Sequence, residues 1–174
     1  MSVQGIDFKK LSLRDALDLA ILIEQEAQER YVELAEQMEQ HRTPEAAAFF
    51  REMATNEARH GSELALRRHK LFGDAPASVT RAMLFDVEAP EYDQGRAFMS
   101  ARAALNVALR SETKAHAFFV AAIPEIAEPE VRRLFEELRD EEIEHQELVR
   151  REIAKLPPDS GVDPEAFGDE PVAQ

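Results

Sequence analysis

The sequence predicts an all-α protein, a bundle of four long helices with one long crossover between the second and third helices. Prolines leave four long proline-free stretches between residues 12 and 156, and apolar residues recur in each stretch at spacings of three and four. A helix of about 28 residues is roughly 42 Å long, and four helices of that length pack as a bundle. Residues 74–92 then form a connection long enough to cross the bundle.

The first hairpin is predicted from signals at its helix ends. The first helix is expected to begin at Ser12, which has the spacing of a capping-box-like pair with Asp15, and to run to about His41. Thr43 is a candidate N-cap for the second helix, and Pro44 suits its first turn. The short link between these helices predicts an antiparallel pair.

The second hairpin is predicted in the same way. Gly73 is expected to end the second helix, since glycine tolerates the left-handed conformation that follows many helices. The third helix is expected to begin around Asp93 and to end before Pro124. The fourth helix is expected to begin at Pro129 and to be blocked by Pro157.

The chain is expected to contain one folded domain. It spans residues 12–156, and a flexible, acidic and proline-rich tail follows over residues 157–174. The longest apolar stretch, residues 16–23, is interrupted by Asp18 and lacks the basic leader of a signal peptide. The sequence thus indicates neither a signal peptide nor a membrane span, and we expect a cytoplasmic protein.

The composition excludes several classes of function. The chain has no cysteine, so it forms no disulfide, iron–sulfur cluster or thiolate nucleophile, and a metal site must use nitrogen and oxygen ligands. Its net charge of -14 is the wrong sign for binding nucleic acid or anionic lipid. Cations and basic partners are better candidates.

An internal repeat relates the two halves of the chain. Residues 12–32 align with residues 100–120 at an offset of 88, which places Glu24 on Glu112. The chain is therefore predicted to be a duplicated helical hairpin. At an offset of 85 the second helix aligns with the fourth, with Glu57 on Glu142 and His60 on His145.

Polar residues occupy equivalent places on the apolar stripes of the predicted helices. A Glu-x-x-His pair lies on the stripe of the second helix and another on that of the fourth, and heptad spacing places one glutamate on each of the other two. We predict that six side chains converge in the core: Glu24, Glu57, His60, Glu112, Glu142 and His145.

Four buried carboxylates need positive charge beside them, because burying an unpaired carboxylate costs several kcal/mol. No lysine or arginine occupies the stripes around the Glu-x-x-His pairs. Two divalent cations would balance the carboxylates, and mixed oxygen and imidazole ligation favours iron, with manganese or zinc as substitutes. The alternatives are a metal-free polar core and a bundle that buffers metal without catalysis.

Three further residues lie near this predicted cluster. Tyr31 is either a hydrogen-bond donor to a ligand, an electron donor or an ordinary core tyrosine. His116 follows Glu112 by one turn and is either an extra ligand or proton relay, or an ordinary surface or core histidine. Gly61 within the second helix indicates close packing beside His60.

At these residues the chain resembles the ferritin-like superfamily of di-iron proteins, in particular its rubrerythrin, erythrin and bacterioferritin branch. The resemblance covers residues 12–156 and implies a ferritin-like four-helix bundle, with its single long crossover, that binds two iron ions. By that likeness, the bridging ligands are Glu57 and Glu142, the terminal carboxylates are Glu24 and Glu112, and the histidine ligands are His60 and His145.

Two departures from rubrerythrins affect the function that the resemblance implies. The chain lacks the cysteines of the rubredoxin module that delivers electrons in rubrerythrins, so an external electron donor is expected. Ala115 stands where rubrerythrins have an additional glutamate, which makes the ligand set resemble that of bacterioferritin. The resemblance implies an oxidoreductase that oxidises ferrous iron with peroxide or dioxygen, either as a peroxidase in oxidative stress or as a ferroxidase. It also implies a homodimer or a higher homo-oligomer.

Overall fold

The structure is a computed structural model that describes residues 7–40, 42–81 and 100–157. Over these ranges it contains four long helices and one short 3-10 helix, and it contains no strand. The predicted all-α class and the four helices are therefore confirmed. The elements are α1 (Leu13–Gln40), α2 (Pro44–Phe72), α3 (Ala101–Ala122), the 3-10 helix η3 (Ile123–Glu125) and α4 (Pro129–Lys155).

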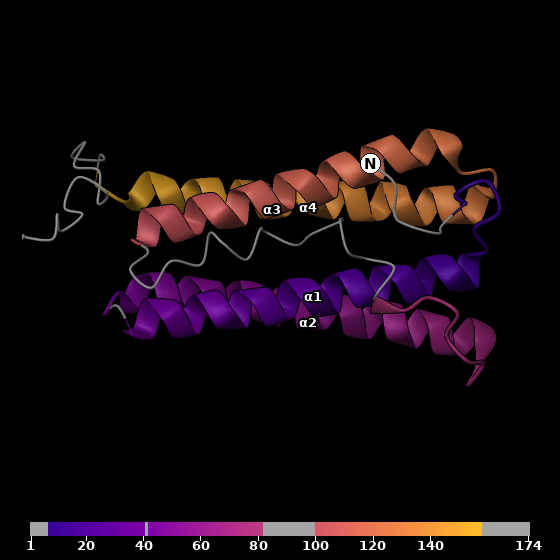
Figure 1. The fold of residues 1–174 in the computed structure, drawn as a ribbon, viewed down its shortest axis with the longest axis horizontal. Helices are drawn as coiled ribbons and strands as arrows, with labels where there is room; N and C mark the ends of the chain where they lie inside the picture. The colour runs from indigo at the N-terminus through magenta and orange to yellow at the C-terminus, as the bar shows by residue number, and fades with distance from the viewer. Residues whose placement is uncertain (1–6, 41, 82–99, 158–174) are drawn as a thin grey trace, which may run out of the picture.

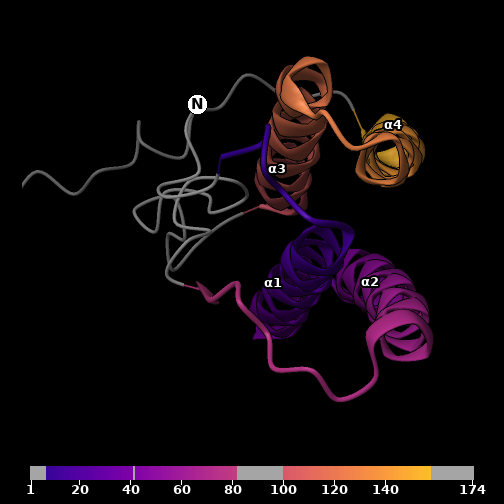
Figure 2. The ribbon, with the colours of Figure 1, turned by 90° about the vertical axis from the view of Figure 1, so that its right-hand side faces the viewer.

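Two antiparallel hairpins form the bundle, because α1 packs against α2 and α3 packs against α4. Figure 1 shows that α2 and α3 run in the same direction, which is the arrangement that a long crossover between them joins. Residues 82–99 of that connection lie outside the described residues. Figure 2 looks along the helices and places the α1–α2 hairpin on one side and the α3–α4 hairpin on the other. This is the predicted ferritin-like arrangement with one long crossover.

Two expectations concern the ends of the chain and the membrane. Apart from Pro157, the predicted tail lies outside the described residues, and the domain boundaries at residues 12 and 156 stay a prediction. None of the described helices is both long enough and apolar enough to cross a membrane.

The ends of the first two helices follow their sequences with one exception. Ser12 accepts a hydrogen bond from the backbone amide of Asp15 (3.2 Å) and donates one to the Asp15 carboxylate (2.7 Å), as a capping pair does. Gly73 ends α2 with a φ of 57°. Thr43 precedes α2 as predicted, but its side chain does not cap that helix. Its hydroxyl instead donates to the Met38 carbonyl (2.9 Å) and so satisfies an acceptor in the last turn of α1.

The third helix begins later than its proline-free stretch predicts. The expected start at Asp93 lies outside the described residues, and Ser100 has an extended backbone, so α3 begins at Ala101. The Ser100 hydroxyl accepts a hydrogen bond from the backbone amide of Ala103 (3.1 Å). Ser100 is the repeat equivalent of Ser12, so the same kind of cap opens both hairpins.

The apolar core is divided into two clusters. One contains Leu17 and Phe135, and the other contains Met38 and Phe50, each with the side chains packed around it. On every helix, the segment that carries the predicted site residues lies between the parts that enter these two clusters. A polar layer therefore crosses the middle of the bundle between two apolar ends.

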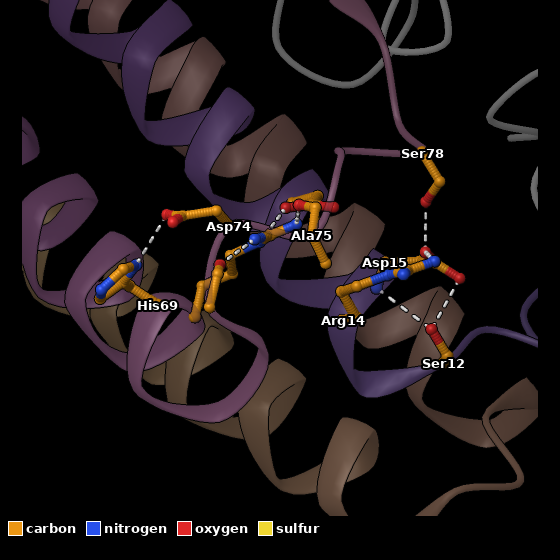
Figure 3. A network of polar contacts seen from close by, with 10 residues as sticks. Ser12, Arg14, Asp15, His69, Asp74, Ala75 and Ser78 are labelled. Carbon is orange, nitrogen blue, oxygen red and sulfur yellow. Dashed lines mark hydrogen bonds and ion pairs between the residues drawn. The ribbon is translucent and has the colours of Figure 1, made fainter.

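Side chains of α1 and α2 hold the chain that follows α2. Arg68 donates to the carboxylate of Asp18 (2.8 Å), and both side chains are nearly buried. The same guanidinium donates to the carbonyls of Gly73 (2.8 Å) and Ala75 (2.5 Å). Figure 3 shows this network next to a second one, in which Asp15 receives hydrogen bonds from Ser12, just before α1, and from Ser78, in the chain that follows α2. The beginning of the crossover is thus fixed against the first hairpin.

Candidate metal centre

All four helices contribute to one polar cluster in the middle of the bundle. Its four glutamates are 3–5% exposed and one histidine, His145, is 5% exposed. The other histidine, His60, lies at the edge of the cluster with 14% of its side chain exposed. The members are Glu24 from α1, Glu57 and His60 from α2, Glu112 from α3, and Glu142 and His145 from α4.

The two histidines lie side by side within the cluster. Their rings are stacked, with centroids 5.4 Å apart and an angle of 6° between the planes. Nδ1 of His145 lies 3.3 Å from Oε1 of Glu57 and 3.5 Å from Oε2 of Glu112. Nδ1 of His60 lies 3.8 Å from Oε2 of Glu24. Carboxylates from three helices therefore face the two imidazoles.

Three groups of side chains in this cluster bring ligand atoms within 4.8 Å of one another. Every predicted ligand belongs to at least one group, and one member, Glu141, is absent from the predicted set. The groups are Glu57, His60 and His145; Glu112, Glu142 and His145; and Glu24, His60 and Glu141.

The sequence also indicates Glu141, but less clearly than it indicates Glu142 on the same apolar stripe of α4. Glu141 follows Leu138 by three residues and precedes His145 by four, so helical spacing places it beside the same apolar stripe. Its neighbour Glu142 fills the centre of the stripe and satisfies the Glu-x-x-His pattern by itself. In the fold, Glu141 offers a ligand atom within 4.8 Å of those of Glu24 on α1 and His60 on α2.

Burial and nearby charges shift the acidity of these groups. Burial, together with the negative charges of Glu141 and Glu112, raises the pKa of Glu24 to about 7, although a hydrogen bond with Glu57 opposes this rise. Burial alone would also raise the pKa of Glu112, but its contacts, first of all with His145, outweigh burial and lower that pKa. Burial opposes a charge on His145, and the neighbouring Glu112 carboxylate outweighs it and raises the pKa of His145. Both shifts favour the protonated forms of Glu24 and His145, which reduce the negative charge of the cluster.

Several polar atoms of the cluster are buried without a hydrogen-bond partner among the described residues. They include Oε2 of Glu24 and the Nδ1 atoms of His60 and His145. An unsatisfied buried polar group costs about 1–3 kcal/mol, so such groups normally have a partner. Divalent transition metals accept both carboxylate oxygen and imidazole nitrogen. The donor set therefore fits metal ions, and these carboxylate and histidine groups are candidate metal ligands.

This chain is similar to a known protein family and to a solved structure. The profile of the rubrerythrin family matches residues 15–93. A solved structure of an uncharacterised conserved protein from Magnetospirillum magnetotacticum MS-1 is 31% identical in sequence with a TM-score of 0.72, and the match covers 87% of this chain and 99% of that chain. The chain belongs to the rubrerythrin family. A search of curated proteins found no match.

Membership of the rubrerythrin family confirms the predicted resemblance and agrees with the donor set, because proteins of this family typically bind metal. The identity of the metal and the role of each ligand stay predictions. His116, which follows Glu112 by one turn, belongs to none of the three groups that the described residues form.

Tyr31 of this rubrerythrin-family chain reaches the cluster from α1. Its hydroxyl donates a hydrogen bond to Oε1 of Glu112, and its ring stacks on Phe50 with centroids 6.1 Å apart. Burial raises the pKa of Tyr31 well above its usual value, and the negative charges of Glu112 and Glu57 raise it further. The hydroxyl therefore keeps its proton and fixes the position of the Glu112 carboxylate.

Replacing Tyr31 by phenylalanine is expected to destabilise the metal-free protein by about 1.5–3 kcal/mol, because a buried hydrogen bond to a charged group is worth about that much. The repeat equivalent of Tyr31 is the buried Phe119, so a phenylalanine ring suits such a position. Urea unfolding of both proteins measures the change. A loss below about 0.5 kcal/mol would show that the hydroxyl adds little to the position of Glu112.

The backbone of α2 approaches α1 at Gly61. A Cβ atom added there would lie 3.4 Å from Cβ of Glu24, which is a van der Waals contact. The close packing predicted for Gly61 is therefore made against α1. A larger side chain at this position would press on the segment that carries Glu24.

Gly61→Ala is expected to raise the stability of the protein by about 0.5–1 kcal/mol, because alanine favours the helix and its methyl group fits. Gly61→Leu is expected to lower it by about 1–3 kcal/mol, because the extra methylenes overpack the α1–α2 contact. The midpoints of thermal unfolding of the natural protein and the two variants test both expectations. Equal midpoints for the alanine and leucine variants would contradict the close approach at Gly61.

Proposed function

We propose that this protein is a non-haem di-iron oxidoreductase that oxidises ferrous iron with peroxide or dioxygen. The observation that carries the proposal is the convergence of four buried glutamates and two histidines, and Glu24, His60 and His145 present buried polar atoms that lack a hydrogen-bond partner within the described part of the chain. Two ferrous ions would balance the four carboxylates, and mixed oxygen and nitrogen ligation suits iron. Manganese and zinc would compete for the same ligands.

The six side chains would provide the ligands of two metal ions. Glu57 and Glu142 come from opposite hairpins, and we propose that each would serve both metal ions. When bound, iron supplies the electrons that reduce peroxide or dioxygen. The apolar clusters on either side exclude water from the two ends of the polar layer. We assign the remaining ligands in pairs, Glu112 with His145 and Glu24 with His60.

The fate of the oxidised iron separates two forms of this function. A peroxidase has its iron reduced in place, and the cysteine-free chain would need an external electron donor for that step. A ferroxidase passes the ferric ions on, and Ala115 in place of an additional glutamate gives this chain the simpler ligand set of bacterioferritin. We expect either reaction to take place in the cytoplasm, in a homodimer or a higher homo-oligomer.

The test is anaerobic loading with ferrous iron followed by elemental analysis and addition of peroxide or air. We expect two irons per chain and a near-ultraviolet absorbance band as the iron becomes ferric. The faster oxidant ranks the peroxidase against the ferroxidase.

Two other outcomes would replace the proposal. Iron that binds without being oxidised by either reagent would indicate a metal buffer. A protein that binds no iron would have a structural polar core, in which the contacts of His145 with Glu57 (3.3 Å) and Glu112 (3.5 Å) stabilise the buried charges.

A further inference from the structure

One carboxylate next to the proposed centre has no role in the assignments above. Glu141 on α4 offers a ligand atom within 4.8 Å of those of Glu24 on α1 and His60 on α2. These three residues come from three helices, so the tertiary fold brings them together. They form a group separate from Glu112, Glu142 and His145.

The group around Glu141 contains atoms that require a partner. Oε2 of Glu24 is buried, with the side chain only 6% exposed, and has no hydrogen-bond partner in residues 7–40, 42–81 and 100–157. Nδ1 of His60, 3.8 Å away, is also buried and has no hydrogen-bond partner in these ranges. A cation between these two atoms and the Glu141 carboxylate would satisfy all three groups at once.

The group opens toward the surface between α2 and α4. Glu141 and His60 are half-buried, and the acids around them are exposed. The negative charges of Glu137, Glu63 and Glu144 act on the Glu141 carboxylate, and all three of these side chains are exposed. Several negative charges around one half-buried carboxylate attract a divalent cation to this edge of the cluster.

The two halves of the centre therefore differ in their ligands. On one side, Tyr31 donates a hydrogen bond to Glu112 and so uses one lone pair of that carboxylate. On the other side, Glu24 has a free oxygen and Glu141 adds a second carboxylate. We propose that Glu141 is a seventh protein ligand, which binds the cation held by Glu24 and His60 and makes this position the tighter of the two. This inference rests on the proposed function, because it assumes that two cations bind.

The test compares Glu141→Gln, Glu141→Asp and Glu144→Gln with the natural protein. Manganese serves as the probe, and electron paramagnetic resonance of free manganese during a titration gives the number of sites and their dissociation constants. Glu144 is the matched control, because it lies on the same helix and the same acidic edge but is exposed and outside all three groups. Glu141→Asp keeps the charge but shortens the side chain by one methylene, so it separates ligation from general attraction.

We expect two manganese ions in the natural protein, bound with unequal affinity. Glu141→Gln and Glu141→Asp should both weaken the tighter position by about tenfold or more, since a lost ligand contact costs at least as much as a lost supporting contact. Glu144→Gln should change it by less than about threefold, because exposed charges are screened. The midpoint of thermal unfolding without metal should be unchanged or higher for Glu141→Gln than for the natural protein. The change removes a carboxylate that neighbouring negative charges repel.

Two results would overturn the inference, and they are distinguishable from failure of the proposed function. If both Glu141 variants bind manganese as the Glu144 variant does, Glu141 is not a ligand, and the two-metal centre stands without it. If Glu141→Asp keeps the natural affinity while Glu141→Gln does not, Glu141 acts only through its charge. A natural protein that binds no manganese and no ferrous iron would refute the proposed function itself and the inference with it.

Discussion

Replacing Glu57 and Glu142 together by glutamine is expected to remove both metals from the protein while leaving the metal-free fold intact. Both carboxylates are buried in the polar layer, and each belongs to a group of potential ligands. Glutamine has the same shape, but its amide is a poor metal ligand and carries no charge. The metal-free variant loses two buried negative charges, so little stability should be lost.

The natural protein and the double variant should differ most in stability when metal is present. A ligand that binds only the folded state at about 100 times its dissociation constant stabilises the protein by about 2.7 kcal/mol. For a chain of this length that corresponds to a rise of roughly 5–10 °C in the unfolding midpoint. We expect this rise with manganese or anaerobic ferrous iron in the natural protein and none in the double variant. Elemental analysis should show two metals per chain in the first protein and almost none in the second.

The control is Glu52→Gln with Glu137→Gln, which makes the same change in charge at another pair of repeat-equivalent positions. Both of these glutamates are exposed and belong to none of the three groups. The control protein should keep both metals and the full rise in midpoint. Metal retained by the Glu57 and Glu142 variant at the natural stoichiometry would show that the buried cluster is not the binding site.

Replacing Arg68 by methionine is expected to destabilise the protein by about 3–5 kcal/mol, because it leaves the buried carboxylate of Asp18 without its cation. Asp18 is 6% exposed, and one of its two oxygens already has no hydrogen-bond partner among the residues that the structure describes. The change also removes the donors to the carbonyls of Gly73 and Ala75, which hold the start of the crossover. Urea unfolding of the metal-free proteins measures the loss.

Two further variants separate the causes of that loss. Arg67→Met removes the neighbouring arginine, whose ion pair with Glu137 (3.0 Å) is partly exposed, and should cost at most about 1 kcal/mol. Combining Arg68→Met with Asp18→Leu removes both buried charges and should recover much of the stability. If Arg68→Met costs no more than Arg67→Met, the Asp18–Arg68 pair does not hold the fold together.

Local helical spacing is sufficient to predict most of this architecture. A residue on an apolar stripe of a long helix has few alternatives to the core, and the repeat shows that Glu24 and Glu112 occupy equivalent stripes. The structure places both at 3–5% exposure. The start of α3 was harder to predict because a proline-free stretch sets only an outer limit, whereas Ser100, the repeat equivalent of Ser12, marks the actual cap.

The features that spacing does not predict depend on contacts between distant segments. Asp18 interrupts an apolar stretch in the sequence, and nothing near it indicates that Arg68, fifty residues later, neutralises it. Glu141 and Glu142 are adjacent acids at one stripe, and only the tertiary fold, which brings Glu24 and His60 close to Glu141, shows that both acids belong to the cluster. Thr43 has the residue type of an N-cap, but the nearby carbonyl of Met38 takes its hydroxyl.

The polar layer between the two apolar clusters also determines the alignment of the helices along their axes. A slip of α4 by one turn, about 5.4 Å, would move Glu142 and His145 toward apolar side chains and leave apolar side chains facing the remaining carboxylates. Each unpaired carboxylate buried in this way costs several kcal/mol, whereas a bundle with a uniform apolar core tolerates such slips. The side chains proposed to bind metal therefore also select a single register for the two hairpins, before any ion is bound.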